Sequence, residues 1–140
     1  MKLTYADVTA GTGIPPVSYP VSRLSLIKYA GASGDFNVIH WNERIARSVG
    51  LPDVIAHGMF TMAQAGRFVT DWAGDFGTVL EFGVRFTAPV VVPDEDHGAT
   101  IEVSGTVEEK LDDNRVVLTV TATSAGTKVL GRARAVVRLP

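Results

Sequence analysis

The sequence predicts an α+β domain in which a curved antiparallel sheet wraps around one central helix. The helix is indicated by "MFTMAQAGRFVTDWAG", residues 59–74, where apolar residues occupy nearly every side, as in a buried helix. The sheet is indicated by a change from a helical to an alternating hydrophobic period after Thr78. At 140 residues the chain has the length of one domain, so we expect residues 1–140 to form a single unit.

The elements expected before the central helix are short. Residues 1–20 carry glycines and prolines around one short strand near "VSYPVS". Ser22 is the expected N-cap of a first helix, which should end at Gly31. Asn42 is the expected N-cap of a second helix, which should end at Gly50.

Four strands are expected after the central helix, in "TVLEFGVRFTAPVVV", "TIEVSGTV", "RVVLTVTAT" and "KVLGRARAVVRL". Alternate residues place apolar side chains on one face, and "KLDDNR" has the composition of a hairpin turn. This element order predicts the hot-dog fold. An isolated sheet of this kind leaves a strand edge and an apolar region uncovered, so we expect the chain to pair with a second copy or a related chain.

Composition argues against several classes of protein. The net charge of −2 provides no field that would attract nucleic acid or an anionic membrane. No apolar run approaches the roughly 20 residues of a membrane helix, and the N-terminus lacks the pattern of a signal peptide. Because the chain has no cysteine, disulfides, thiolate nucleophiles and cysteine-type zinc sites are excluded. The cytoplasm is the default expectation.

The segment "SGDFNVIHWN", residues 33–42, carries the first candidate site. Asp35 and His40 lie on the connection between the two short helices, where catalytic groups are often found. A histidine and a carboxylate can form an acid–base pair near neutral pH. Asn37 could orient one of them. The alternative is a turn in which Asp35 caps backbone amides, Asn37 adopts a left-handed conformation and His40 is a hydrogen-bonded polar side chain.

The segment "IAHGMFTM" carries the second candidate site. Gly58 begins the central helix, so its N–H is among the donors that lack an intrahelical acceptor and can hold an oxyanion or a polarised carbonyl. The alternative is that this glycine only caps the helix. For His57, both a structural hydrogen bond and a role in shaping the ligand site remain open.

Other polar residues are weaker candidates. Arg132 and Arg134 share a predicted strand face with Lys128 and Arg138, and this face either contacts the phosphates of coenzyme A or an acidic carrier protein, or is simply solvated. His97 lies in an expected loop. Asp35, His40 and His57 could together form a metal site, but their spacing matches no zinc motif, so we expect no metal. We also expect no cofactor.

The two motifs together resemble the signatures of the MaoC-like (R)-specific enoyl-thioester hydratases, in which a Gly-Asp-x-Asn-Pro-aliphatic-His segment carries the catalytic dyad. Within that family, "GDFNVIHW", "IAHGMFTM", "VRFTAPV" and "GRARA" are most similar to the catalytic B subunits of actinobacterial (3R)-hydroxyacyl-ACP dehydratases of type II fatty-acid synthesis. One position departs from the family pattern, since Val38 replaces the usual proline. Its absence could loosen the loop but removes no proton-transferring group.

The resemblance implies a hot-dog enzyme that interconverts (3R)-hydroxyacyl and trans-2-enoyl thioesters of an acyl carrier protein or coenzyme A. It implies that His40 exchanges the C2 proton, that Asp35 handles the hydroxyl or the attacking water, and that Gly58 polarises the thioester carbonyl. It also implies a dimer with a different hot-dog subunit, with a homodimer as the alternative. A hot-dog thioesterase and a non-catalytic partner subunit are the competing interpretations.

Overall fold

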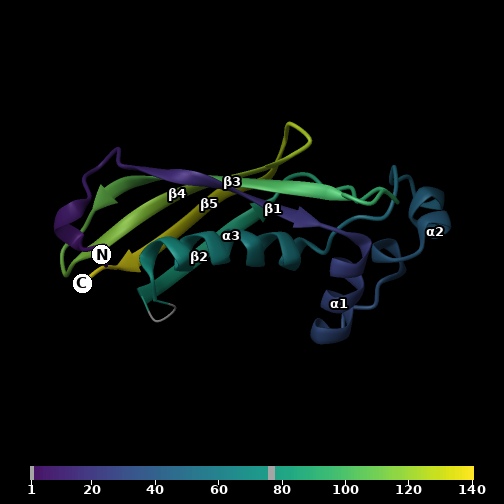
Figure 1. Ribbon diagram of the computed structural model, residues 1–140, viewed down its shortest axis with the longest axis horizontal. Helices are drawn as coiled ribbons and strands as arrows, with labels where there is room; N and C mark the ends of the chain where they lie inside the picture. Colours follow the sequence, from purple (N-terminus) through teal and green to yellow (C-terminus); the bar gives the residue numbers. More distant parts are fainter. Residues whose placement is uncertain (1, 76–77) are drawn as a thin grey trace.

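The computed structural model describes residues 2–75 and 78–140. One curved sheet runs along the length of the molecule and α3 lies against one of its faces, while α1 and α2 lie together at one end (Figure 1). The helical elements in chain order are the 3-10 helix Tyr5–Asp7, α1 Arg23–Ser33, the 3-10 helix Val38–His40, α2 Glu43–Ser48 and α3 Gly58–Ala73. The strands are β1 Gly13–Val21, β2 Val79–Phe86, β3 Ala99–Lys110, β4 Arg115–Ser124 and β5 Thr127–Arg138.

The five strands form one antiparallel sheet in the order β1-β3-β4-β5-β2. The predicted α+β architecture, a curved sheet around one helix, is therefore confirmed. The predicted hairpin turn also forms, with Asp113 and Asn114 at positive φ angles of 60° and 54°. β1 is longer than the expected short strand, and β2 ends at Phe86, so the segment "APVVV" that follows is not part of it.

The core lies between α3 and the concave face of the sheet. α3 is buried along one side only, through the six residues Phe60, Thr61, Ala65, Phe68, Val69 and Ala73. The expected central helix is therefore confirmed, and its outer face, formed by Met59, Ala63, Arg67 and Asp71, is exposed. A Cβ atom at Gly105 would lie 3.0 Å from the ring of Phe68. The absence of a side chain at this glycine therefore allows α3 to approach β3 closely.

The predicted helix starts are confirmed. Ser22 accepts a hydrogen bond from the Ser25 N–H at the start of α1, and Asn42 caps α2 in the same way. The predicted stop at Gly31 is wrong, since α1 continues to Ser33 and ends at Gly34. Gly34 has a φ of 77° and so adopts the left-handed conformation that closes helices, whereas Gly31 is an interior helical residue.

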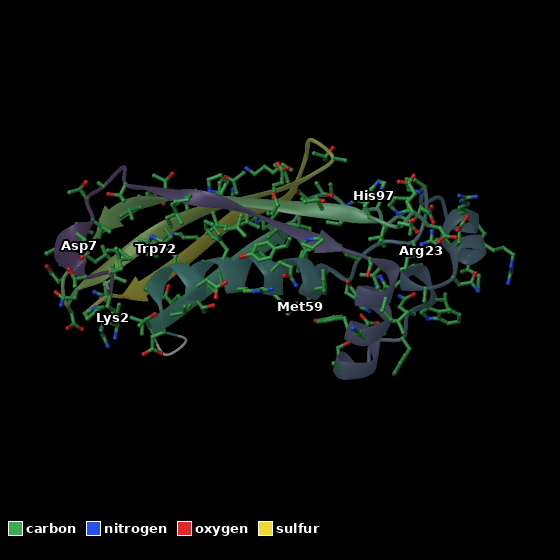
Figure 2. All side chains as sticks on the ribbon, viewed as in Figure 1. Lys2, Asp7, Arg23, Met59, Trp72 and His97 are labelled. Carbon is green, nitrogen blue, oxygen red and sulfur yellow. The ribbon has the colours of Figure 1, made fainter. Side chains whose placement is uncertain are left out.

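A group of ion pairs fixes the end of the molecule that carries α1 and α2. Arg23 donates to the Val92 carbonyl at 3.2 Å, to Glu43 at 3.0 Å and to the largely buried Asp53 at 2.6 Å. These contacts join the start of α1 to the start of α2, to the segment before α3 and to the segment after β2. Figure 2 labels Arg23 at this place. The contacts fix the start of α2, which follows the Asp35–His40 loop, to the start of α1. No helix within the described residues is long and apolar enough to span a membrane.

Candidate active site

The loop between α1 and α2 is ordered by its own short polar contacts. The Asn37 N–H donates to Asp35 Oδ1 at 3.1 Å, and the Ile39 N–H donates to Asn37 Oδ1 at 3.3 Å. Asn37 has a φ of −54°, so the left-handed conformation considered for it is not adopted. The 3-10 turn that follows carries His40 inward until it is only 8% exposed, whereas the Asp35 side chain remains 52% exposed.

The His40 ring is oriented by a backbone carbonyl. Its Nδ1 lies 2.7 Å from the Ile55 carbonyl oxygen, which can only accept a hydrogen bond, so Nδ1 carries the proton when the ring is neutral. Nε2 is then the free base, and it lies 3.9 Å from Asp35 Oδ2. This separation is too long for a direct hydrogen bond, but one oxygen atom about 2.8 Å from both would fit between them.

The environment keeps His40 neutral at pH 7. Burial is the main influence and lowers the pKa of His40 below its ordinary value, and His57 lowers it further. The Ile55 carbonyl and the Asp35 carboxylate raise the pKa of His40, but by less than burial lowers it. His40 therefore presents an unprotonated Nε2 toward the carboxylate of Asp35.

His57 lies directly behind the pair. It is 1% exposed, and its ring stacks on that of His40 with centroids 3.8 Å apart and planes inclined by 23°. Its Nε2 lies 3.0 Å from the backbone carbonyl oxygen of Asp35, and its ring meets that of Tyr29 edge to face with centroids 4.8 Å apart. His57 immediately precedes α3, and His40 lies in the 3-10 helix between α1 and α2.

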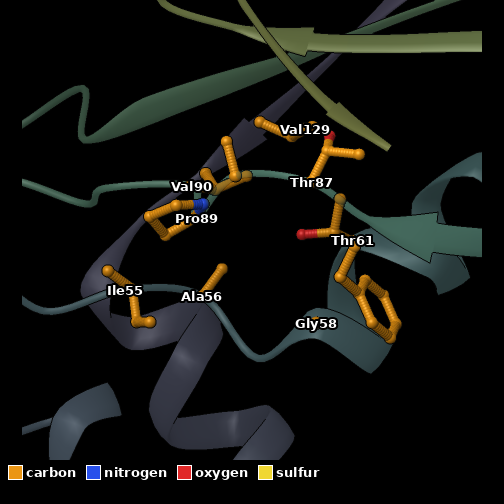
Figure 3. Close-up of a pocket in the computed structure, with 10 residues that line it drawn as sticks. Ile55, Ala56, Gly58, Thr61, Thr87, Pro89, Val90 and Val129 are labelled. Atoms are coloured by element: carbon orange, nitrogen blue, oxygen red, sulfur yellow. The ribbon is translucent and has the colours of Figure 1, made fainter. Parts of the chain in front are cut away.

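Gly58 is the first residue of α3, as predicted, and it lies at a cavity of about 370 Å³ (Figure 3). The cavity walls are mostly apolar; they comprise Ile55, Ala56, Gly58, Thr61, Phe86, Thr87, Ala88, Pro89, Val90 and Val129. Ile55 lines this cavity and holds His40 through its carbonyl, so the cavity and the dyad share the short segment that leads into α3.

Arg132 and Arg134 do not line this cavity. They line a separate shallow depression over β2 and β5, together with Glu81, Phe82, Gly83 and Val136. Their neighbours in the strand, Ala133 and Ala135, belong to the core beneath α3. Strand alternation therefore directs Arg134 to the outer face of the sheet, away from the helix side that carries the dyad.

Asp35, His40 and His57 also form the cluster of possible metal ligands within the described residues, with one ligand atom of each within 4.8 Å of the others. The arrangement does not fit a zinc ion. The two imidazole rings are stacked, so their nitrogen lone pairs run side by side instead of converging. His57 Nε2 already faces the Asp35 carbonyl.

Three contributors to the site were not identified from the sequence. The Ile55 carbonyl is a backbone group and has no sequence signal. Phe86 packs its ring against Gly58, and Thr61 lies on the cavity wall one turn into α3. Thr61 follows Gly58 by three residues, and this helical spacing was the one available signal.

Comparison with known proteins identifies the family of the chain. A family model described as the MaoC like domain matches residues 8–126. The chain belongs to the MaoC-like domain family. A solved MaoC-like dehydratase superposes on 99% of this chain with a TM-score of 0.95 and 40% identity. The R-hydratase PhaJ1 from Pseudomonas aeruginosa superposes on 99% of this chain and 86% of its own, with a TM-score of 0.85 and 28% identity. The hot-dog fold and the family resemblance are thus confirmed.

Among curated proteins, 3-hydroxyacyl-thioester dehydratase X of Mycobacterium tuberculosis is 35% identical over 79 residues, which are 56% of this chain. The match covers 27% of that relative, and the match to the solved MaoC-like dehydratase covers 43% of its chain. The chain thus spans less than half the length of these two proteins.

Proposed function

We propose that this chain is an (R)-specific hydratase/dehydratase that interconverts (3R)-hydroxyacyl and trans-2-enoyl thioesters in fatty-acid metabolism. The observation that carries the proposal is the pairing of a neutral, tautomer-fixed His40 with Asp35, at a separation of 3.9 Å that accommodates one water or hydroxyl oxygen. The names of the similar dehydratases and of the R-hydratase support this choice within the family.

The proposed reaction needs two proton transfers. In dehydration, His40 Nε2 accepts the proton at C2, and the electrons of that C–H bond form the C2–C3 double bond. Asp35 enters this direction in its protonated form, and the C3–O bond breaks as the hydroxyl takes the Asp35 proton and leaves as water. The proton that His40 Nε2 gained then returns to the Asp35 carboxylate, so the pair again holds one proton for the next turnover. In hydration, the same protons move in the opposite direction. No electrons are exchanged with another molecule, so acid–base chemistry suffices.

Gly58 and the adjacent cavity form the proposed binding site for the thioester. Removal of the C2 proton places negative charge on the thioester oxygen, and the Gly58 N–H at the start of α3 can stabilise that charge. The apolar cavity beside Gly58 can accept part of the acyl thioester. Asn37 contributes by holding the loop through its contacts with Asp35 and Ile39.

We further propose that the site works in a dimer with another hot-dog subunit. The catalytic carboxylate is half-exposed, and Phe36, Trp41 and Met59 are large apolar side chains that are 62%, 47% and 56% exposed. β1 and β2 are the edge strands, and only β1 contains prolines, which discourage further pairing. A second subunit at β2 would lie beside α3 and could shield the dyad from water.

The resemblance to two-subunit dehydratases favours a different hot-dog chain as the partner. Size-exclusion chromatography of the chain alone, and with candidate partner chains, distinguishes the alternatives. A stable and active homodimer would contradict the heterodimer. The outward position of Arg134 favours a docking role for an acidic carrier protein over a contact with bound substrate, and we expect the protein to act in the cytoplasm.

Purified protein should hydrate trans-2-enoyl thioesters of graded length, linked to coenzyme A or to carrier protein, and yield the (3R) alcohol. The loss of enoyl-thioester absorbance measures the rate, and chiral analysis identifies the product. Release of free thiol from an acyl thioester would instead indicate a thioesterase. Absence of turnover with an assembled partner would indicate a non-catalytic subunit.

A further inference from the structure

His57 is buried against both members of the dyad, yet the proposed chemistry gives it no proton to transfer. Its Nε2 lies 3.0 Å from the Asp35 carbonyl oxygen, and its ring covers that of His40 at 3.8 Å. These contacts reach the acid through its backbone and the base through its ring. One side chain therefore touches both catalytic groups from the side away from solvent, since it is itself 1% exposed.

The hydrogen bond to the Asp35 carbonyl determines which ring nitrogen of His57 is the donor. A carbonyl oxygen only accepts, so Nε2 must carry the proton. Nδ1 is buried and has no hydrogen-bond partner among the described residues. A ring that donates from Nε2 to a backbone carbonyl and buries Nδ1 suits a supporting role and leaves no ring nitrogen facing the substrate.

Both catalytic side chains need such support. Asp35 follows the end of α1, its side chain is half-exposed, and its carboxylate accepts from the Asn37 N–H within the same loop. The His57 bond connects this loop to the start of α3, and the edge contact with Tyr29 in turn restrains the His57 ring. A fixed loop matters because a displacement of about 1 Å in a catalytic group can lower a rate on the order of 100-fold.

We propose that His57 is the positioning residue of the dyad, holding Asp35 through the Nε2–H bond to its carbonyl and His40 through ring stacking. This inference deepens the proposed function and rests on it. His57 is then a determinant of turnover and not a substrate-binding residue, since its polar atoms face protein groups or are buried.

Two amide substitutions provide a matched test. In His57→Gln the amide nitrogen is as many bonds from Cα as Nε2, so the bond to the Asp35 carbonyl can form. In His57→Asn the amide ends at the position of Nδ1, and the bond is lost. We expect kcat of the Asn variant to fall about 10- to 100-fold with KM changed less than about threefold. The Gln variant keeps the hydrogen bond but loses the ring that stacks on His40, so we expect its kcat to fall less, by up to about tenfold.

Amide ¹⁵N relaxation gives a readout that does not depend on turnover. Order parameters at Asp35 and Asn37 should stay near about 0.85 in wild type and His57→Gln, and fall below about 0.6 in His57→Asn. His57→Phe, which keeps a stacked ring without a donor, replaces the Asn variant if that variant does not fold, and the same losses are expected.

Equal kcat values in the Gln and Asn variants, or an unchanged loop in His57→Asn, would overturn the positioning role. If the wild-type protein turns over no enoyl thioester, the proposed function fails. The order parameters then still decide whether His57 holds the Asp35 loop.

Discussion

Replacing Gly58 with alanine adds one methyl group at the point where the thioester carbonyl is proposed to bind. A Cβ built on Gly58 would lie 3.1 to 3.3 Å from three ring carbons of Phe86. Carbon atoms prefer separations of about 3.5 to 4.0 Å, so the ring must move by several tenths of an ångström. Phe86 is 55% exposed and can turn toward solvent, so we expect a stability cost of about 1 kcal/mol, at the low end for overpacking.

The expected effect on activity is much larger. A methyl group beside the Gly58 N–H would keep the carbonyl from its hydrogen bond, and loss of one such donor lowers kcat on the order of 100- to 1,000-fold. Hydration of a crotonyl thioester, followed by absorbance, measures kcat and KM. Thermal unfolding of the same preparations measures stability, so that the two effects can be separated.

The double variant Gly58→Ala with Phe86→Ala is the matched control. It removes the contact between the new methyl group and the ring, so the double variant should be as stable as Phe86→Ala while activity stays low. Phe86→Ala alone reports what the ring itself contributes. If Gly58→Ala keeps wild-type kcat, or if the double variant regains it, the assignment of Gly58 as carbonyl donor is refuted.

Two further predictions concern protonation and stability. In an NMR titration His40 should have a pKa below its ordinary 6.5, because burial is the largest influence on it, and Asp35→Asn should lower it further, because the carboxylate raises it. Because the pKa of His40 is lower in the folded than in the unfolded chain, the free energy of unfolding is not reduced by His40 above about pH 6.5 and falls as the pH drops toward the folded pKa. Urea unfolding at several pH values would show this as a falling midpoint. Arg23→Met leaves the largely buried Asp53 without its 2.6 Å partner and should cost about 3 kcal/mol in urea unfolding. Arg67→Ala, which breaks an exposed pair with Asp71, should cost less than about 1 kcal/mol, and equal losses would contradict the role of burial.

The sheet and the central helix could be predicted because their hydrophobic periods are visible in the sequence. Ile101, Val103 and Val107 alternate with exposed residues and all three are buried in the structure. The helix starts could also be predicted, since Ser22 and Asn42 cap the helices through their own side chains. The end of α1 was not, because Gly31 and Gly34 are equally plausible stops until the backbone shows which one has a positive φ.

The candidate site was predictable in its side chains but not in their arrangement. Asp35, His40 and Gly58 were identified from two motifs, and the structure places the first two within 3.9 Å of each other and the third on the adjacent segment. The Ile55 carbonyl that orients His40 has no side-chain signal. The stacking of His57 on His40 depends on how α3 packs beside the loop, which no local pattern encodes.

The most direct test of the proposed dyad is the turnover of Asp35→Asn, His40→Ala and the variant that carries both changes, in crotonyl-thioester hydration. Each single change should lower kcat on the order of 100- to 10,000-fold. The double variant should be little worse than either, because the two groups act on one substrate as a unit. His97→Ala, at a histidine whose side chain is 84% exposed in a loop, should keep wild-type kcat. Near-normal turnover in either Asp35→Asn or His40→Ala would contradict the proposed mechanism.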